Sequence, residues 1–161
     1  MRLDSISVIL ITLNEEKSVQ KCLDSVRWAD EIILVDSHST DCTVDIAKRY
    51  TDKIFLRKFT DYSDQKNFAL SKACCPWVIS IDADEEVSAE LKGEIFSIVS
   101  QSDAADGYSV HRRSRIFKRW FRFSGTQDDQ PVRLFRRQKA KFFQTVHETL
   151  KVEGRLRRMR Y

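Results

Sequence analysis

Residues 6–12 read Ile6-Ser7-Val8-Ile9-Leu10-Ile11-Thr12, and this run decides the fold class. Apolar, mostly β-branched residues fill it, which is typical of a strand covered on both faces in a parallel sheet. Asn14 follows at an expected helix N-cap. Apolar residues then recur at helical spacing at Val19, Cys22, Leu23 and Val26. The stretch therefore predicts a strand followed by a helix.

The same unit repeats along the chain. Further strands are expected at Glu31–Val35, near Ile54 and at Trp77–Ile81, and further helices at Thr43–Tyr50, Tyr62–Ala73 and Ser88–Val99. This alternation predicts an α/β fold with an open, mostly parallel nucleotide-binding sheet and helices on both faces. After residue 106 the periodicity weakens, and strand-like pieces are expected at Tyr108–His111, Val132–Phe135 and Lys141–Phe143.

The length indicates one domain, and the charge distribution divides it into an acidic and a basic part. The 161 residues are 42% hydrophobic, enough for one substantial core. Residues 1–106 carry 12 Lys/Arg against 20 Asp/Glu, whereas residues 107–161 carry 16 against 4. We expect the first part to bind a nucleotide, and the second, a smaller mixed β region of the same domain, to shape the acceptor side.

The basic second part suits an anionic partner. Nucleic acid, an anionic membrane surface and a phosphorylated acceptor all fit the charge, and a solvated face without a partner is the simpler alternative. Nucleic acid ranks last, because no nucleic-acid-binding motif accompanies the charge and the first part is acidic. The sequence shows no signal peptide, membrane span or zinc-site cysteine spacing, so we expect a cytoplasmic protein.

Polar residues follow three of the expected strands: Thr12-Leu13-Asn14, Asp36-Ser37 and Asp82-Ala83-Asp84. Ligands of open α/β sheets bind beyond the carboxyl ends of the strands, so these residues should share one crevice. Asp36 can accept a hydrogen bond from a base or ribose, although a helix cap is the alternative, and Ser39, Thr40 or Asp41 could cap the helix that follows. Asp82 and Asp84 suit Mg²⁺ or Mn²⁺ shared with substrate phosphates, although a solvated acidic loop is the alternative.

Four segments resemble the successive motifs of family 2 glycosyltransferases, which have the GT-A fold: Ile11–Glu16, Val35–Thr43, Gln65–Leu70 and Asp82–Glu85. Two later segments, Arg133–Arg137 and Val146–Glu148, resemble motifs of the WaaE-like lipopolysaccharide core biosynthesis subgroup. The resemblance implies a metal-dependent, inverting transfer of a hexose or heptose from a nucleoside-diphosphate sugar. The implied acceptor is a saccharide or glycolipid at the inner face of the cytoplasmic membrane.

The resemblance also implies roles for individual residues. Thr12 and Asn14 would line the nucleotide pocket, Asp36 would hold the base, and Asp82 would contact the ribose or the donor sugar. Asp84 would bind the metal, with His147 near the metal or diphosphate. The same motifs add Leu13, Glu16, Ser37, Lys66, Asn67, Ala83 and Arg133 to the donor pocket. Arg133, Arg136 and Arg137 could instead clamp an acceptor phosphate, but alternation along a strand places Arg136 on the other face, so we do not expect all three to share one role.

A single displacement needs a carboxylate that takes the proton from the acceptor hydroxyl. Asp129 is the first candidate, with Asp128 and Glu148 as substitutes, and an Asp-Asp turn before Pro131 is the structural alternative. The chain departs from the subgroup at His38, where glycine is usual. It also stops where the family typically continues into helical segments, so we expect a truncation. A binding module without turnover is the competing class of function.

Overall fold

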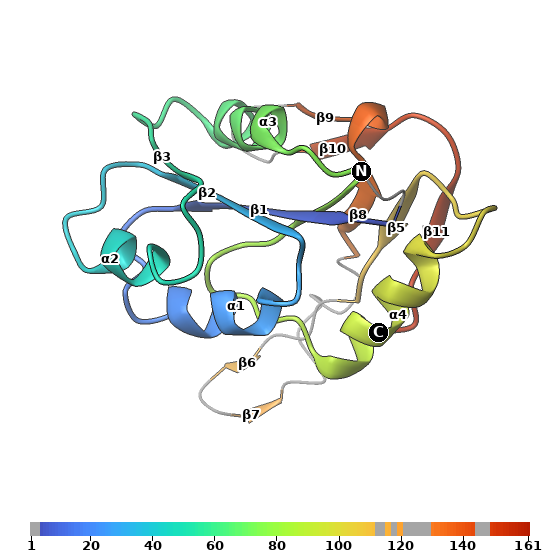
Figure 1. The fold of residues 1–161 in the computed structure, drawn as a ribbon, viewed down its shortest axis with the longest axis horizontal. Helices are drawn as coiled ribbons and strands as arrows, with labels where there is room; N and C mark the ends of the chain where they lie inside the picture. The colour runs from blue at the N-terminus through green and yellow to red at the C-terminus, as the bar shows by residue number, and fades with distance from the viewer. Residues whose placement is uncertain (1–3, 112–114, 117–118, 121–129, 144–148) are drawn as a thin grey trace.

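A seven-stranded sheet lies at the centre of the computed structural model, which describes residues 4–111, 115–116, 119–120, 130–143 and 149–161 (Figure 1). Within these residues the strand order is β11-β5-β8-β4-β1-β2-β3. The bounds of the strands are β1 Ile6–Thr12, β2 Glu31–Asp36, β3 Ile54–Leu56, β4 Trp77–Ser80, β5 Gly107–Ser109, β8 Val132–Arg136 and β11 Leu156–Arg158.

The strand directions divide the sheet into a parallel and a mixed half. β1 pairs in parallel with β2 and β4, and β2 pairs in parallel with β3. β8 runs antiparallel to its neighbours β4 and β5, and β11 pairs in parallel with β5. The predicted fold class, an open and mostly parallel α/β sheet with a smaller mixed β region, is confirmed.

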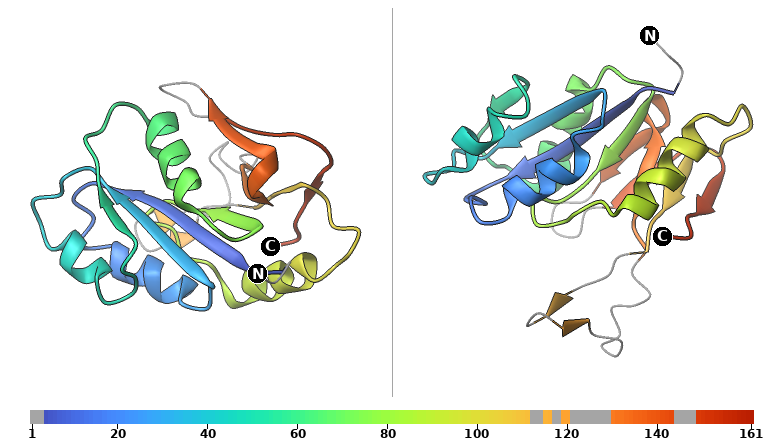
Figure 2. Two further views of the ribbon diagram at one scale, coloured as in Figure 1. Left: turned by 45° about the horizontal axis from the view of Figure 1, so that its top comes forward. Right: turned by 60° about the horizontal axis from the view of Figure 1, so that its bottom comes forward.

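Helices cover both faces of the sheet (Figures 1 and 2). α1 (Val19–Val26), α2 (Thr43–Ala47) and α4 (Ala89–Val99) lie on one face. On the other face lie α3 (Tyr62–Lys72) and a hairpin of β9 (Ala140–Phe143) and β10 (Thr149–Val152), which a 3-10 turn, η2 (Arg137–Lys139), joins to β8. Two short strands, β6 (Arg115–Ile116) and β7 (Arg119–Trp120), pair only with each other among the described residues.

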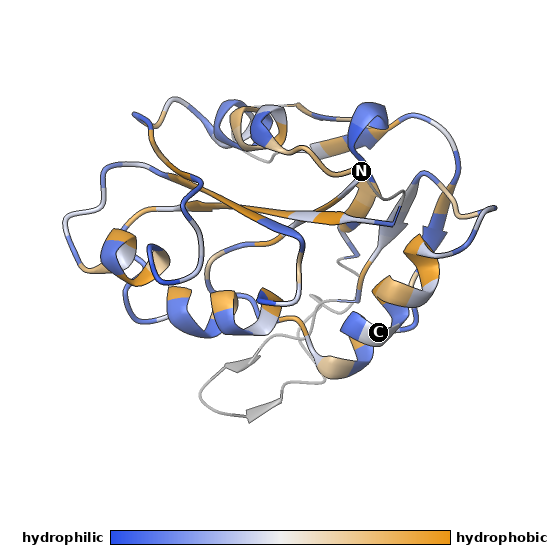
Figure 3. Cartoon of the chain, in the orientation of Figure 1, coloured by the Kyte–Doolittle hydropathy of each residue, from blue (hydrophilic) through white to orange (hydrophobic). Residues whose placement is uncertain are grey.

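Each face of the sheet builds its own hydrophobic core. The core under α1 and α4 includes Val8 and Leu10 of β1, and the core under α3 includes Ile9 of the same strand. β1 therefore supplies side chains to both faces, as its uninterrupted apolar sequence predicts. Figure 3 shows β1 and β2 as nearly continuous hydrophobic strands between helices whose outer sides are hydrophilic.

Three sequence-based expectations were wrong in detail. Helix α1 begins at Val19 with Ser18 at the N-cap, and Asn14 instead adopts a left-handed backbone conformation with φ 57°. The α2 helix ends at Ala47, after which tight turns continue the chain to Tyr50. Strands β6, β7, β10 and β11 were not predicted: the first three have only two to four residues each, and β11 is an edge strand whose three residues are exposed and give no hydrophobic signal.

Candidate functional site

The ends of β1 and β2 are joined through Asp36. Thr12 and Asp36 are paired in the strand register, and Thr12 Oγ1 donates to Asp36 Oδ2 at 2.8 Å. The Ser39 N–H donates to Asp36 Oδ1 at 2.7 Å, and the Ser39 hydroxyl donates to Oδ2. Asp36 is 0% exposed, so its carboxylate serves the protein's own turn in this structure. Its expected contact with a base stays a prediction.

The loops after β1 and β2 hold each other by reciprocal hydrogen bonds. The Asn14 N–H donates to Ser39 Oγ, and Asn14 Oδ1 accepts from the Thr40 N–H, both at 2.8 Å. His38 lies at φ 63°, in the left-handed region that favours glycine, which explains why the related motif has glycine there. The loop residues Leu13, Asn14 and Glu16 are exposed beside this junction.

The residue at the N-cap of α2 is Cys42, whose side chain makes no capping hydrogen bond. Asp41, one position earlier, accepts from the Thr43 N–H at 2.9 Å and from the Thr43 hydroxyl, so its carboxylate bonds the first N–H of α2. Ser39 and Thr40 instead pair with Asp36 and Asn14. Of the three predicted cap candidates, only Asp41 therefore contacts the start of α2, and it does so from outside the N-cap position.

Three successive residues of α3 connect the strand ends. Gln65 Nε2 donates to Ser37 Oγ at 2.9 Å, and Lys66 Nζ lies 3.1 Å from Asp82 Oδ1. The Asn67 side chain exchanges hydrogen bonds of 2.9 and 3.0 Å with the backbone of Phe142 in β9. Successive helical side chains point about 100° apart, which lets one turn of α3 reach three elements. Gln65 and Lys66 thus link the end of β2 to the end of β4.

Asp82 accepts from two cationic side chains. Besides Lys66, Arg133 of β8 donates to Asp82 Oδ2 at 2.8 Å and to Glu85 Oε1 at 2.6 Å. Glu85 also accepts from the Asp82 N–H at 2.9 Å, which closes the turn. Burial opposes ionisation of Asp82, but the charges of Arg133 and Lys66 outweigh it and lower its pKa to about 2. Asp82 is therefore a carboxylate at neutral pH, held in place with its side chain 35% exposed.

Glu85 was not predicted to stabilise this turn. Its spacing, three residues after Asp82, is the spacing at which a side chain can close a turn on a backbone N–H. Arg133 was assigned to the donor pocket or to an acceptor phosphate. In the structure it is bound to Asp82 and Glu85, while Arg136 lies over the Trp77 ring at 4.0 Å. The expectation that these arginines do not share one role agrees with this geometry.

Asp84 differs from Asp82 in having no polar partner among the described residues, and it is exposed. Ala83, between them, is buried. Burial above all, and to a smaller extent the negative charges of Glu85, Asp82 and Asp84, raises the pKa of the nearby Cys22 thiol to about 12. Within the described residues, no three His, Cys, Asp or Glu side chains form a cluster that could hold a metal. One free carboxylate in a negative field still fits a cation that takes its other ligands from phosphates and water.

Four expected residues, Asp128, Asp129, His147 and Glu148, lie outside the described residues. The structure therefore brings together Thr12, Asp36, Ser37, Lys66, Asp82 and Arg133 through a chain of contacts, and places Asn14 and Asn67 beside it. No helix of the described residues is long and apolar enough to span a membrane.

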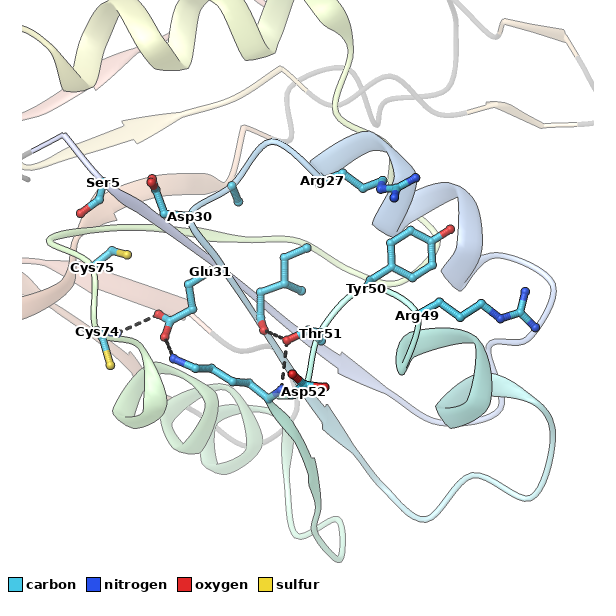
Figure 4. A pocket seen from close by; sticks show the side chains of 13 residues that line it. Ser5, Arg27, Asp30, Glu31, Arg49, Tyr50, Thr51, Asp52, Cys74 and Cys75 are labelled. Carbon is cyan, nitrogen blue, oxygen red and sulfur yellow. Dashed lines mark hydrogen bonds and ion pairs between the residues drawn. The ribbon is translucent and has the colours of Figure 1, made fainter.

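A hollow lies at the opposite end of the strands from these residues (Figure 4). Glu31, at the start of β2, accepts there from Lys53, from the Ser7 hydroxyl and from the Cys74 N–H. Burial opposes ionisation of Glu31, but the hydrogen bonds from Lys53 and Ser7 lower its pKa below the usual range. The lining mixes acidic residues such as Asp52 with basic ones such as Arg49, and includes none of the predicted site residues. We assign this hollow a structural role.

Comparisons with known proteins agree with the geometry. Residues 7–159 match the family described as Glycosyl transferase family 2. The chain is 33% identical over 156 residues to the lipopolysaccharide core biosynthesis glycosyltransferase LpsC of Rhizobium meliloti, covering 92% of this chain and 58% of LpsC. The chain thus spans about half the length of the curated relatives it matches.

Two solved structures share the fold. S. aureus TarS 1–349 in complex with UDP-GlcNAc matches with a TM-score of 0.64 at 17% identity, over 98% of this chain and 59% of TarS 1–349. Glucosyl-3-phosphoglycerate synthase from Mycobacterium tuberculosis, in complex with Mn²⁺ and UDP-glucose, matches with a TM-score of 0.56 at 22% identity, over 66% of this chain and 43% of the synthase. Their architecture is the GT-A fold that the motifs implied.

Proposed function

Because this chain belongs to glycosyl transferase family 2, we propose that it transfers a sugar from a nucleoside-diphosphate donor to a saccharide or glycolipid acceptor. The similarity to LpsC supports an acceptor of the bacterial cell envelope, such as a lipopolysaccharide core. The proposed transfer is a single displacement that inverts the anomeric carbon. Residues 1–106 would bind the donor and residues 107–161 would face the acceptor.

The observation that carries this proposal is the linked set of strand ends. Ser37 after β2 and Asp82 after β4 are both held by α3, through Gln65 and Lys66. A nucleotide lying across the ends of parallel strands would meet Thr12 and Asn14 first and the Asp82 turn next. The UDP and UDP-sugar complexes of the fold relatives support a uridine nucleotide as donor.

Asp82 would accept a hydrogen bond from a ribose or donor-sugar hydroxyl. Its low pKa keeps it an acceptor at neutral pH, and Lys66 and Arg133 fix its direction. Holding the carboxylate before the donor arrives removes an ordering cost at binding. In this proposal Lys66 and Arg133 act mainly through Asp82.

Asp84 would hold a divalent cation, Mg²⁺ or Mn²⁺, together with His147. The Mn²⁺ complex of the mycobacterial synthase supports the choice of metal. A bound cation would neutralise charge that develops on the diphosphate leaving group. Asp129 would take the proton from the acceptor hydroxyl, with Glu148 as the substitute base.

The test is a thermal-shift panel of UDP, GDP and UDP-sugars, with and without Mn²⁺, on the wild type and on Asp84→Asn. Ligand at 100 times its Kd adds about 2.7 kcal/mol of stability, a shift that is easily measured. We expect stabilisation by UDP that needs Mn²⁺ and is lost in Asp84→Asn. Glu86→Gln is the matched control, because Glu86 is exposed in the same acidic run and its change removes the same charge.

Stabilisation by UDP that is equal in the wild type and in Asp84→Asn would contradict the metal role, and no response to any nucleotide would contradict the proposed function. Incubation with UDP-GlcNAc, followed by NMR of the anomeric proton, then separates transfer from binding alone. Binding without any product would support the competing class, a module that recognises a nucleotide sugar.

A further inference from the structure

The outer face of the β9–β10 hairpin carries two lysines directly opposite each other. The antiparallel register pairs Lys141 with Lys151, and both side chains are exposed. Neither ammonium group makes an ion pair with a described carboxylate, and like charges placed opposite in a sheet destabilise it. The hairpin therefore keeps an unfavourable interaction that a bound anion would relieve.

An exposed aromatic ring lies between the two charges. Phe143 is 38% exposed, with Lys151 Nζ 4.9 Å and Lys141 Nζ 5.5 Å from its ring centroid. The neighbouring Phe142 points the other way and is buried against α3. The outer face thus presents one apolar ring flanked by two cations, a combination suited to the boundary between lipid headgroups and acyl chains.

The charge around this face is also positive. Residues 139–153 hold three lysines against Glu148 and Glu153. Glu148 lies outside the described residues, and Glu153 follows β10 at the end far from Phe143, where its N–H bonds to the Lys139 carbonyl. The surrounding segment 107–161 holds 16 Lys/Arg against 4 Asp/Glu. Figure 1 shows the hairpin on the face of the sheet that carries α3, opposite the face that carries α1 and α2. Such a surface is complementary to an anionic bilayer.

We propose that the outer face of the β9–β10 hairpin docks on an anionic phospholipid membrane through Lys141, Lys151 and Phe143. This inference goes beyond the proposed transfer, because it concerns a surface of the chain and needs no donor. It deepens the proposal in one respect, since a docked hairpin would bring residues 107–161 to a membrane-held acceptor.

Vesicle co-sedimentation tests the surface directly. Mixed phosphatidylglycerol–phosphatidylcholine vesicles are compared with pure phosphatidylcholine vesicles, using the wild type and the double variant Lys141→Gln/Lys151→Gln. We expect binding that requires phosphatidylglycerol, weakens with added salt, and falls roughly five-fold for each lysine removed, about 25-fold for the pair. Phe143→Ser should weaken binding at unchanged net charge.

The matched control is Lys17→Gln/Lys21→Gln, which removes the same charge from exposed lysines at the start of α1. We expect its binding to stay within about two-fold of the wild type. Equal losses in the two double variants, or no preference for phosphatidylglycerol, would overturn the proposal. Binding to duplex DNA but not to vesicles, or hairpin-dependent self-association in light scattering, would also overturn it in favour of another occupant.

Folding of the variants is checked by the melting temperature at low salt. Because Lys141 and Lys151 repel each other, their replacement should leave the melting temperature unchanged or raise it. A lowered melting temperature would contradict the argument that the pair is strained. None of these measurements uses a nucleotide, so failure here and failure of the proposed sugar transfer are separate results.

Discussion

Replacing Arg133 with glutamine should loosen the turn that follows β4. Arg133 bridges Asp82 and Glu85, and its removal leaves Lys66 as the one remaining described cation on Asp82. The glutamine side chain is shorter and neutral, so it can replace neither ion pair. We expect the pKa of Asp82 to rise towards its ordinary value and the protein to lose stability at neutral pH.

The size of this loss in free energy of unfolding follows from the lowered pKa of Asp82. Its pKa is lowered from 3.8 to about 2, and one pKa unit corresponds to about 1.4 kcal/mol, which gives an upper bound of roughly 2.5 kcal/mol for both cations together. The carboxylate is 35% exposed, so solvent screening reduces the share of Arg133 to about 1 kcal/mol. Because the folded pKa is depressed, this stabilisation is complete above pH 3.8 and disappears as the pH falls towards 2.

Urea denaturation measures the prediction at neutral pH and at several points in the acid range. The difference in free energy of unfolding between wild type and Arg133→Gln should be constant down to pH 3.8 and shrink below it. Arg158→Gln, an exposed site on the edge strand β11, is the charge-matched control and should show no such pH dependence. A difference that does not change with pH, or an Asp82 carboxyl whose ¹³C titration is the same in both proteins, would refute the reasoning.

Three other substitutions and measurements test the structure elsewhere. His38→Gly should be as stable as the wild type or up to about 1 kcal/mol more stable, because glycine adopts a positive φ without strain. His38→Val should be less stable, and urea denaturation that ranks the variants otherwise would contradict the positive φ at residue 38. Gly154→Ala should cost about 2 kcal/mol, since its Cβ would meet Asp106 Oδ2 at 2.1 Å at φ 115°, and an unchanged melting temperature would be inconsistent with that contact. In the folded protein, iodoacetamide should label the exposed Cys74 and leave the buried Cys22 unlabelled until urea unfolds the chain. Mass spectrometry measures both, and rapid labelling of Cys22 without urea would disprove its burial.

The parallel half of the fold could be predicted because its signals are local. Residues 6–12 form an apolar run that fits only a strand covered on both faces, and Val19, Cys22, Leu23 and Val26 mark one face of a helix. The β10 and β11 strands carry no comparable pattern, since both are short, β11 is exposed throughout and β10 alternates over only four residues. Their existence depends on pairing with strands distant in sequence, which periodicity does not report.

The sequence predicted which candidate residues lie near one another better than it predicted their hydrogen-bond partners. The sequence indicated that Asp36, Asp82 and Lys66 belong near one crevice, because they follow strands or lie in a matching motif. It gave no indication that Ser39 accompanies Thr12 on Asp36, or that Glu85 and Arg133 fasten Asp82. The Arg133 contacts depend on how β8 returns beside β4, a long-range pairing that no nearby residue encodes. The Ser39–Asp36 and Glu85–Asp82 contacts are local, but they depend on the exact conformation of each turn.

The position of β1 between β2 and β4 has a consequence for how the polypeptide emerges from the ribosome. β2 can pair with β1 as soon as residues 31–36 are made, but the other edge of β1 stays open until Trp77–Ser80 follow. Throughout that interval an apolar strand presents unpaired N–H and C=O groups, which favours association with other nascent chains. Slowing translation between β2 and β4 should therefore increase the need for chaperones.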